Sequence, residues 1–225
     1  MAIKPILFNT EMVRAILDGR KTCTRRLVRF LPGENPQWTG YIRDGLMLYN
    51  GRNEPCIIKA PYQPGDILYV RETWEHFECW NCEGDERGNC PNEPQKSVLD
   101  KTCGCYMYRA TNEIRGDARW HPSIHMPKEA ARIWLKVTDV RVERLQEITN
   151  DGCVAEGIYP SNCRECNAAF GCDTCIDEGY SEIDEFTEVW NSTIKKSDID
   201  RYGWDASPWV WVIEFERCEK PEGVK

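Results

Sequence analysis

A short basic segment, Gly19-Arg20-Lys21-Thr22-Cys23-Thr24-Arg25-Arg26, carries residue types that could form a reaction centre. It holds four cationic side chains and two threonine hydroxyls within eight residues. A lysine can act as a base on a neighbouring hydroxyl when burial or nearby cations lower its pKa from about 10.4 towards neutrality. A hydroxyl activated in this way can attack an acyl carbon. Lys21 is therefore the candidate base and Thr24 the candidate nucleophile.

The chain around this segment must turn if Lys21 and Thr24 are to act together. In a regular strand, side chains three residues apart point to opposite faces. Gly19 makes a turn accessible because glycine adopts backbone conformations that other residues avoid. Residues 11–18 have helical apolar spacing and predict a short helix that ends at Gly19. Residues 24–30 predict the strand that follows.

The distribution of charge favours a local anionic ligand over a nucleic-acid duplex. The chain has 225 residues and a net charge of −8, but residues 1–30 hold seven basic and two acidic side chains, a net charge of +5. One basic patch on an acidic body suits a phosphate, a nucleotide or a short single strand. Arg20, Arg25 and Arg26 are the candidate ligand contacts. The alternative is an ordinary solvated surface on which these arginines pair with nearby acids.

The apolar pattern predicts a globular protein without a membrane partner. Hydrophobic residues make up 41% of the chain, which is enough for a sizeable core. No apolar run approaches the roughly 20 residues that span a bilayer. Residues 1–8 are too short for the apolar region of a secretory signal, so we expect a cytoplasmic protein.

The order of the predicted elements indicates an α+β fold around a curved sheet or small barrel with flanking helices. Strands are expected at 67–74, 132–144 and 208–215, the last one buried on both faces. A short helix is expected within 145–157, ending at Glu156, and a longer one begins at Ser181 with a capping-box pattern and runs to Ile194. No glycine-rich dinucleotide or phosphate-loop motif is present.

We expect a single domain over 1–217, interrupted by two Cys-rich insertions at 77–105 and 160–180 and followed by a tail at 218–225.

Thirteen cysteines in a cytoplasmic chain favour metal binding over disulfides. Two Cys-x-x-Cys pairs in the second insertion can close a tetrahedron around structural Zn²⁺, namely Cys163, Cys166, Cys172 and Cys175. The first insertion offers five candidates for four places at a second site: Cys79, Cys82, Cys90, Cys103 and Cys105.

These patterns together resemble the ASCH domain family, which is similar to the PUA RNA-binding barrel. The match includes Gly19-x-Lys21-x-x-Thr24-x-Arg26, the turn and strand at 64–74, the segment 145–157 and the closing strand at 209–215. The segment 120–127 is similar to phage and prophage members of the family. The resemblance covers most of the chain outside the two insertions.

The resemblance implies an activity and a third catalytic residue. The best-defined enzymes of the family are small amidohydrolases that deacylate N4-acetylcytidine with a lysine, a threonine and a glutamate. Lys21 and Thr24 match the first two, and Glu156 is the best match for the glutamate. Other members resemble RNA binders or a ribonuclease, so a non-catalytic RNA or modified-base binding module and a ribonuclease are the alternatives. The greater length of this chain and its insertions leave the substrate open.

Several other side chains are candidate ligand contacts. Glu72 could meet the edge of a base, and Trp74 and Trp120 could stack on one, because aromatic rings contribute about 1–3 kcal/mol to stacking a base. A proline-bounded loop carries three further polar candidates: His121, Ser123 and His125. The competing interpretation is that these side chains serve packing rather than ligand binding. A thiol nucleophile at Cys23 is a minor interpretation because its neighbours offer no dedicated base.

Overall fold

The computed structural model describes most of the chain outside the predicted insertions. The described residues are 1–29, 37–42, 45–49, 55–78, 95–96, 103–112, 119–158 and 181–223. For the strands within 37–57, and at 77–78, 95–96 and 103–105, the description is confined to the backbone. The second insertion, 160–180, lies outside the described residues, as does most of the first.

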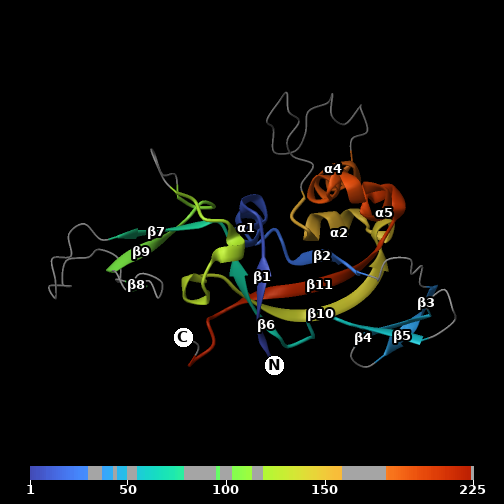
Figure 1. Ribbon diagram of the computed structural model, residues 1–225, viewed down its shortest axis with the longest axis horizontal. Helices are drawn as coiled ribbons and strands as arrows, with labels where there is room; N and C mark the ends of the chain where they lie inside the picture. Colours follow the sequence, from blue (N-terminus) through green and yellow to red (C-terminus); the bar gives the residue numbers. More distant parts are fainter. Residues whose placement is uncertain are drawn as a thin grey trace. The chain divides into compact units, whose positions relative to one another are not determined.

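The fold is α+β, as the sequence predicts, and the described residues form one sheet of five strands and two of three strands (Figure 1). The larger sheet has the order β1-β6-β10-β11-β2, and the smaller ones β3-β4-β5 and β7-β9-β8. The longest strand, β10, bends along its length (Figure 1). The strands are β1 (Ile3–Leu7), β2 (Cys23–Leu27), β3 (Gln37–Ile42), β4 (Gly45–Tyr49), β5 (Pro55–Lys59), β6 (Ile67–Arg71), β7 (Trp74–Glu78), β8 (Gln95–Lys96), β9 (Cys103–Tyr108), β10 (Trp134–Arg144) and β11 (Trp209–Cys218).

The α-helices are short, and their ends follow the sequence signals. α1 (Thr10–Leu17) is followed by Gly19, whose φ of 76° is the left-handed conformation that favours glycine. α2 (Asn150–Ala155) ends with Glu156 as its C-cap, and Gly157 follows at φ 85°. α4 (Glu182–Thr193) and α5 (Ile199–Tyr202) are the other α-helices among the described residues. No helix among the described residues has both the length and the apolar character that crossing a membrane requires.

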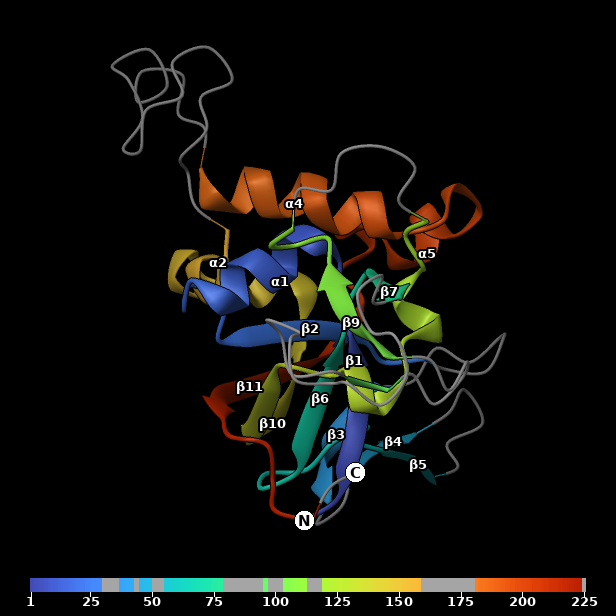
Figure 2. The ribbon, with the colours of Figure 1, turned by 90° about the vertical axis from the view of Figure 1, so that its left-hand side faces the viewer.

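The chain forms two compact units. The first contains Met1–Ala2, Asp18–Ile67 and Lys136–Glu216, and the second contains Ile3–Leu17, Leu68–Leu135 and Arg217–Lys225. In the first unit, α2 and α4 pack beside each other and bury an apolar cluster with β2 and β11 (Figures 1 and 2). The buried members of that cluster are Cys23, Leu145, Ile148, Cys153, Phe186, Trp190, Val210 and Val212.

Strand β11 anchors the strand that carries the basic segment. β11 pairs antiparallel with β2, with Ile213 opposite Thr24 and Val212 opposite Arg25. Four consecutive β11 residues, Val210 to Ile213, are at most 5% exposed. The prediction of a closing strand buried on both faces is therefore confirmed, and the basic segment pairs with a deeply buried strand.

The predicted strand at 67–74 is two strands in the structure. β6 ends at Arg71 and β7 begins at Trp74, and they belong to different sheets. Between them, the backbone N–H of Glu72 donates to Met126 Sδ at 3.1 Å rather than to a strand partner. The Glu72 carboxylate is 1% exposed and takes two hydrogen bonds of 2.9 Å from Arg132. The ion pair of Glu72 and Arg132 therefore lies where the predicted strand is interrupted.

We predict that Ser181→Ala lowers the free energy of unfolding by about 0.5–2 kcal/mol, because it removes an N-cap. Ser181 Oγ accepts the backbone N–H of Asp184 at 3.3 Å, and Asp184 accepts the N–H of Ser181 at 2.8 Å. Denaturant unfolding checks the change. Ser197→Ala is the matched control on an exposed serine and should alter stability by less than about 0.5 kcal/mol. Equal losses in both variants would contradict the capping box.

Candidate active site

The segment that carries Lys21 is held from both sides by the backbone. The N–H of Thr22 donates to the carbonyl of Ala155 at 2.9 Å, at the end of α2. The N–H of Phe215 in β11 donates to the carbonyl of Thr22, also at 2.9 Å. These bonds join the basic segment to residues more than 130 positions away. They bring the end of α2, and with it Glu156, beside Lys21.

Lys21 and Glu156 form a buried ion pair. Lys21 Nζ lies 2.5 Å from Glu156 Oε2, and it also donates to the backbone carbonyl of Glu156 at 2.9 Å. The Lys21 side chain is fully buried and that of Glu156 is 6% exposed. The low polarity of such a site strengthens the attraction between the two charges but also makes each one costly to leave unpaired. Two of the three predicted catalytic residues are thus in direct contact.

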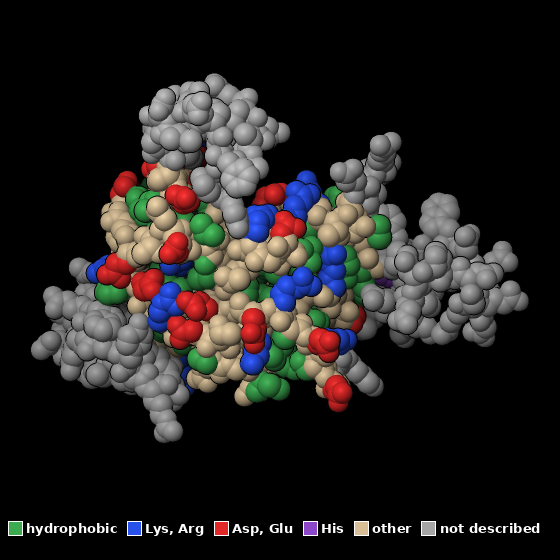
Figure 3. Space-filling view, turned by 180° about the vertical axis from the view of Figure 1, so that it is seen from behind, with side chains coloured by type: hydrophobic (Ala, Val, Ile, Leu, Met, Phe, Trp, Pro, Cys, Tyr) green, Lys and Arg blue, Asp and Glu red, His purple; other side chains and the backbone are tan. Residues whose placement is uncertain are grey.

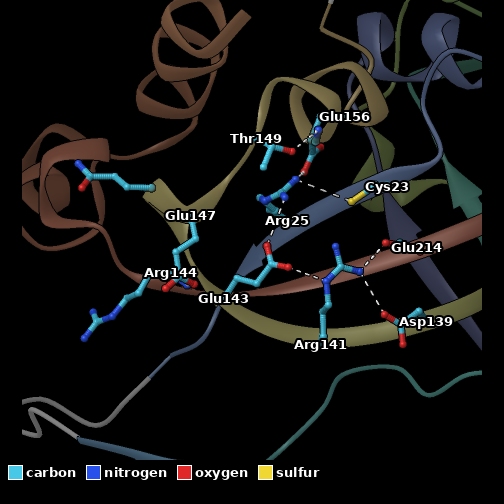
Figure 4. A network of polar contacts seen from close by, with 12 residues as sticks. Cys23, Arg25, Asp139, Arg141, Glu143, Arg144, Glu147, Thr149, Glu156 and Glu214 are labelled. Atoms are coloured by element: carbon cyan, nitrogen blue, oxygen red, sulfur yellow. Dashed lines mark hydrogen bonds and ion pairs between the residues drawn. The ribbon is translucent and has the colours of Figure 1, made fainter.

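A second cation, Arg25, lies on the other oxygen of Glu156. Arg25 Nη1 is 3.4 Å from Glu156 Oε1, and Arg25 Nη2 is 3.4 Å from Glu143 Oε2 in β10 (Figure 4). The Arg25 side chain is 3% exposed. Helix α2 approaches the Arg25 guanidinium closely. A Cβ added at Gly152 would lie only 3.2 Å from Arg25 Nη2. Glu156 is therefore held between a lysine and an arginine.

Thr24, the predicted nucleophile, lies on the same strand as Arg25 and is 2% exposed. Alternation along β2 places the Thr24 side chain on the face opposite to those of Cys23 and Arg25. Thr24 is next to Arg25 in the chain, but its side chain lies on the other face of β2 from the one that carries the contact between Arg25 and Glu156.

A cavity of about 600 Å³ lies beside the ion pair, within the first unit. Its walls come from β2, β10, β11 and α2 and include Cys23, Arg25, Arg141, Glu143, Thr149 and Gly152. Lys21, Thr24 and Glu156 are not among its lining residues. Arg25 belongs to both places, because it lines the cavity and contacts Glu156.

Further charges beyond Arg25 form a network that the sequence-based prediction missed. Arg141 donates to Glu143 at 2.5 Å, to Asp139 at 3.1 Å and to Glu214 in β11 (Figure 4). Burial works against the charge of Arg141, but these three hydrogen bonds outweigh it and raise its pKa. A signal was present in the sequence, because Asp139, Arg141 and Glu143 alternate along a predicted strand and so share one face.

Two buried thiols lie near this network. Burial, followed by the charge of Glu156, raises the pKa of Cys23 to about 12. Burial raises the pKa of Cys153 to about 11. The thiolate is the nucleophilic form of cysteine, so both side chains stay protonated and unreactive near neutral pH. The protonated state of Cys23 argues against the minor interpretation of a thiol nucleophile.

The other predicted arginine contacts are already engaged within the first unit. Arg20 Nη2 lies 2.9 Å from Asp18 Oδ2, and Arg20 Nη1 donates to the carbonyl of Gly157 at 3.3 Å. Arg26 is half-buried. Burial of its charge lowers its pKa more than the attraction of the neighbouring Tyr62 raises it. Figure 3 shows one face of the molecule, on which basic and acidic side chains of the described residues are interspersed.

The remaining predicted contacts belong to the second unit. Trp74 is 4% exposed and its ring lies 5.1 Å from that of His121, so it is packed within the protein. Trp120 and Ser123 are half-buried, and His125 is exposed at the end of a short 3₁₀ turn, η2 (Ser123–His125). Glu72 has both oxygens occupied by Arg132, whose guanidinium also stacks over the Tyr108 ring at 4.0 Å.

The two zinc sites stay predictions. Cys103 and Cys105 are described only as backbone of β9, and the other seven cysteines lie outside the described residues: Cys79, Cys82, Cys90, Cys163, Cys166, Cys172 and Cys175. Within the described ranges, no group of three or more His, Cys, Asp or Glu side chains could hold a metal ion.

Comparisons of the chain with protein-family models, with curated proteins and with solved structures found no match.

We predict that Glu156→Gln destabilises the protein more than Lys21→Met does. The glutamine leaves two buried cations, Lys21 and Arg25, without their shared carboxylate, and breaking a buried pair costs about 3–5 kcal/mol. In Lys21→Met, Glu156 still faces Arg25. Denaturant unfolding of both variants checks the order. The opposite order would show that Arg25 does not neutralise Glu156.

We predict that iodoacetamide labels Cys23 and Cys153 at pH 7.5 far more slowly than it labels a small-molecule thiol. Burial raises both pKa values, so little thiolate forms. Peptide mass spectrometry after timed labelling measures the rate at each cysteine. The half-exposed Cys218 is the internal comparison, and both buried thiols should become reactive in denaturant. Rapid labelling of Cys23 in the folded protein would overturn its assignment as an inert thiol.

Proposed function

We propose that this protein is a hydrolase of the ASCH, PUA-like type that deacylates N4-acylcytidine-type substrates with Lys21, Thr24 and Glu156. The observation that supports this proposal best is the buried contact between Lys21 Nζ and Glu156 Oε2. The resemblance to the ASCH family singles out these two residues, although they lie 135 positions apart in the chain. A buried ion pair adds little stability compared with apolar side chains of similar size, so a role in function accounts for it better.

The charge pairing favours a small nucleoside over a nucleic-acid strand as the ligand. Strand binding by charge needs cations that are available to phosphates. Three cations of the basic segment face carboxylates instead, since Arg20 pairs with Asp18, Lys21 with Glu156, and Arg25 with Glu156 and Glu143. The alternatives of an RNA-binding module and a ribonuclease are therefore less well supported than the nucleoside hydrolase.

The proposed reaction uses Glu156 as a proton store. Lys21 passes one proton from Nζ to Glu156 Oε2, and the neutral amine then removes the proton of the Thr24 hydroxyl as Oγ1 attacks the acyl carbon. When the C–N bond breaks, Lys21 returns a proton to the exocyclic nitrogen of cytidine. Water then cleaves the acyl-threonine ester by the same route and releases the acid. Arg25 holds the second oxygen of Glu156 and so fixes the direction of Oε2.

We expect the wild-type protein to release cytidine from N4-acetylcytidine, and Lys21→Ala and Thr24→Val to lower kcat/KM by at least about 10²-fold, the usual range for losing an acid–base group. Chromatographic separation of substrate and product measures the rate. Lys136→Ala is the matched control, because it removes the same side chain from an exposed ion pair with Glu216.

The same wild-type and variant proteins distinguish the hydrolase from the RNA-binding module and the ribonuclease. The panel adds other N4-acylated cytidines and short RNA strands, with and without a chelator. Absence of turnover by folded wild-type protein across the acylated nucleosides would end the hydrolase proposal. RNA cleavage that Lys21→Ala removes would favour the ribonuclease instead.

A further inference from the structure

The proposed reaction depends on one oxygen of Glu156 staying beside Lys21. Lys21 Nζ lies 2.5 Å from Glu156 Oε2, and Arg25 Nη1 lies 3.4 Å from Glu156 Oε1. The terminal torsion of a glutamate side chain is broad, so a carboxylate that is held at one oxygen alone can turn. Arg25 limits this rotation, and whatever fixes Arg25 therefore also acts on the contact between Glu156 and Lys21.

The orientation of the Arg25 guanidinium depends on its two terminal nitrogens. Nη1 faces Glu156, and Nη2 lies 3.4 Å from Glu143 Oε2 (Figure 4). Arg25 Nε is buried and has no hydrogen-bond partner in the part of the chain that the structure describes. An arginine side chain has many rotamers, so ordering it in one position carries an entropic cost. The ion pair with Glu143 is the contact that holds the far side of the guanidinium.

Glu143 is itself fixed on β10. Its other oxygen, Oε1, lies 2.5 Å from Arg141 Nε. Arg141 is in turn held by Asp139 at 3.1 Å and by Glu214 in β11. The Glu143 carboxylate is therefore an anchored point to which the more mobile Arg25 side chain is bound.

Helix α2 leaves space for this arrangement at Gly152. A glycine inside a helix is less favourable than an alanine. A Cβ at this position would lie 3.2 Å from Arg25 Nη2 and 3.0 Å from Ile148 Cγ1. The space that Arg25 and Ile148 occupy accounts for a glycine in so short a helix.

From these contacts we propose that Glu143 is a positioning residue of the candidate active site. It holds Arg25, and through Arg25 it keeps Glu156 Oε2 against Lys21. Its consequence for the reaction rests on the proposed hydrolase function. Glu143 makes no contact with the substrate in this account, so its loss lowers kcat and leaves KM unchanged.

A double-variant cycle with Arg25 tests the proposal. Glu143→Gln removes the charge at nearly constant shape, and we expect it to lower kcat for N4-acetylcytidine at least about fivefold, with KM within about twofold. In an Arg25→Met background the same substitution should change kcat by less than about twofold, because the residue through which Glu143 acts is gone. Arg25→Met leaves Glu156 with Lys21 and Glu143 with Arg141, and thermal unfolding checks that each variant folds.

Asp139→Asn is the matched control for Glu143→Gln. Both acids contact Arg141, but of the two only Glu143 also forms an ion pair with Arg25 among the described residues. Asp139→Asn should therefore change kcat by less than about twofold.

A second readout does not need turnover. Proton–nitrogen NMR measures how fast the Lys21 ammonium exchanges its protons with water, and loss of the signal in Lys21→Met assigns it. Glu143→Gln should raise that rate at least about fivefold, because a Glu156 carboxylate that turns away opens the hydrogen bond from Nζ. The rate should change by less than about twofold in Asp139→Asn, and when Glu143→Gln is added to Arg25→Met.

Equal effects of Glu143→Gln with and without Arg25 would overturn the proposal, as would an exchange rate of Lys21 that Glu143→Gln leaves unchanged. A rise in KM that exceeds the fall in kcat would also overturn it, because Glu143 would then contact the substrate. If folded wild-type protein shows no turnover, the hydrolase proposal fails by itself. The exchange rates still decide in that case whether Glu143 positions Glu156.

Discussion

The buried attraction between the Lys21 ammonium and the Glu156 carboxylate is the interaction on which the polar network of the first unit depends. It joins the start of β2 to the end of α2, and backbone hydrogen bonds through Thr22 hold the same junction. In that environment each of the two charges needs an opposite charge beside it. The apolar cluster between α2, α4, β2 and β11 supplies the general stability that offsets the cost of such a polar junction.

Arg25 extends this pair into a larger network. One guanidinium contacts both Glu156 and Glu143, and Glu143 in turn contacts Arg141. A change of charge at the cavity can therefore reach Glu156 through a single side chain. Because every step is a contact between opposite charges, a substitution anywhere along it leaves a partner unsatisfied, and effects within the network should not be additive.

Much of the fold could be predicted from local sequence signals, and the reasons are physical. Gly19 and Gly157 end helices because only glycine adopts their backbone conformation cheaply, and the capping box at Ser181 is a short-range pattern. The interruption after β6 was missed because it depends on Arg132 and Met126, which lie 60 and 54 residues from Glu72. The role of Arg25 as a bridge was missed for the same reason, since its partners are distant in the chain.

The central claim is that the Lys21–Glu156 pair serves chemistry rather than stability. The double variant Lys21→Met with Glu156→Leu tests it most directly, because it replaces the ion pair with apolar side chains of similar size. The account predicts that this variant is more stable than Glu156→Gln, because Lys21 no longer leaves a buried charge and Arg25 keeps Glu143, and that it loses N4-acetylcytidine hydrolysis. A folded double variant that retains the hydrolysis rate of the wild type would contradict the account.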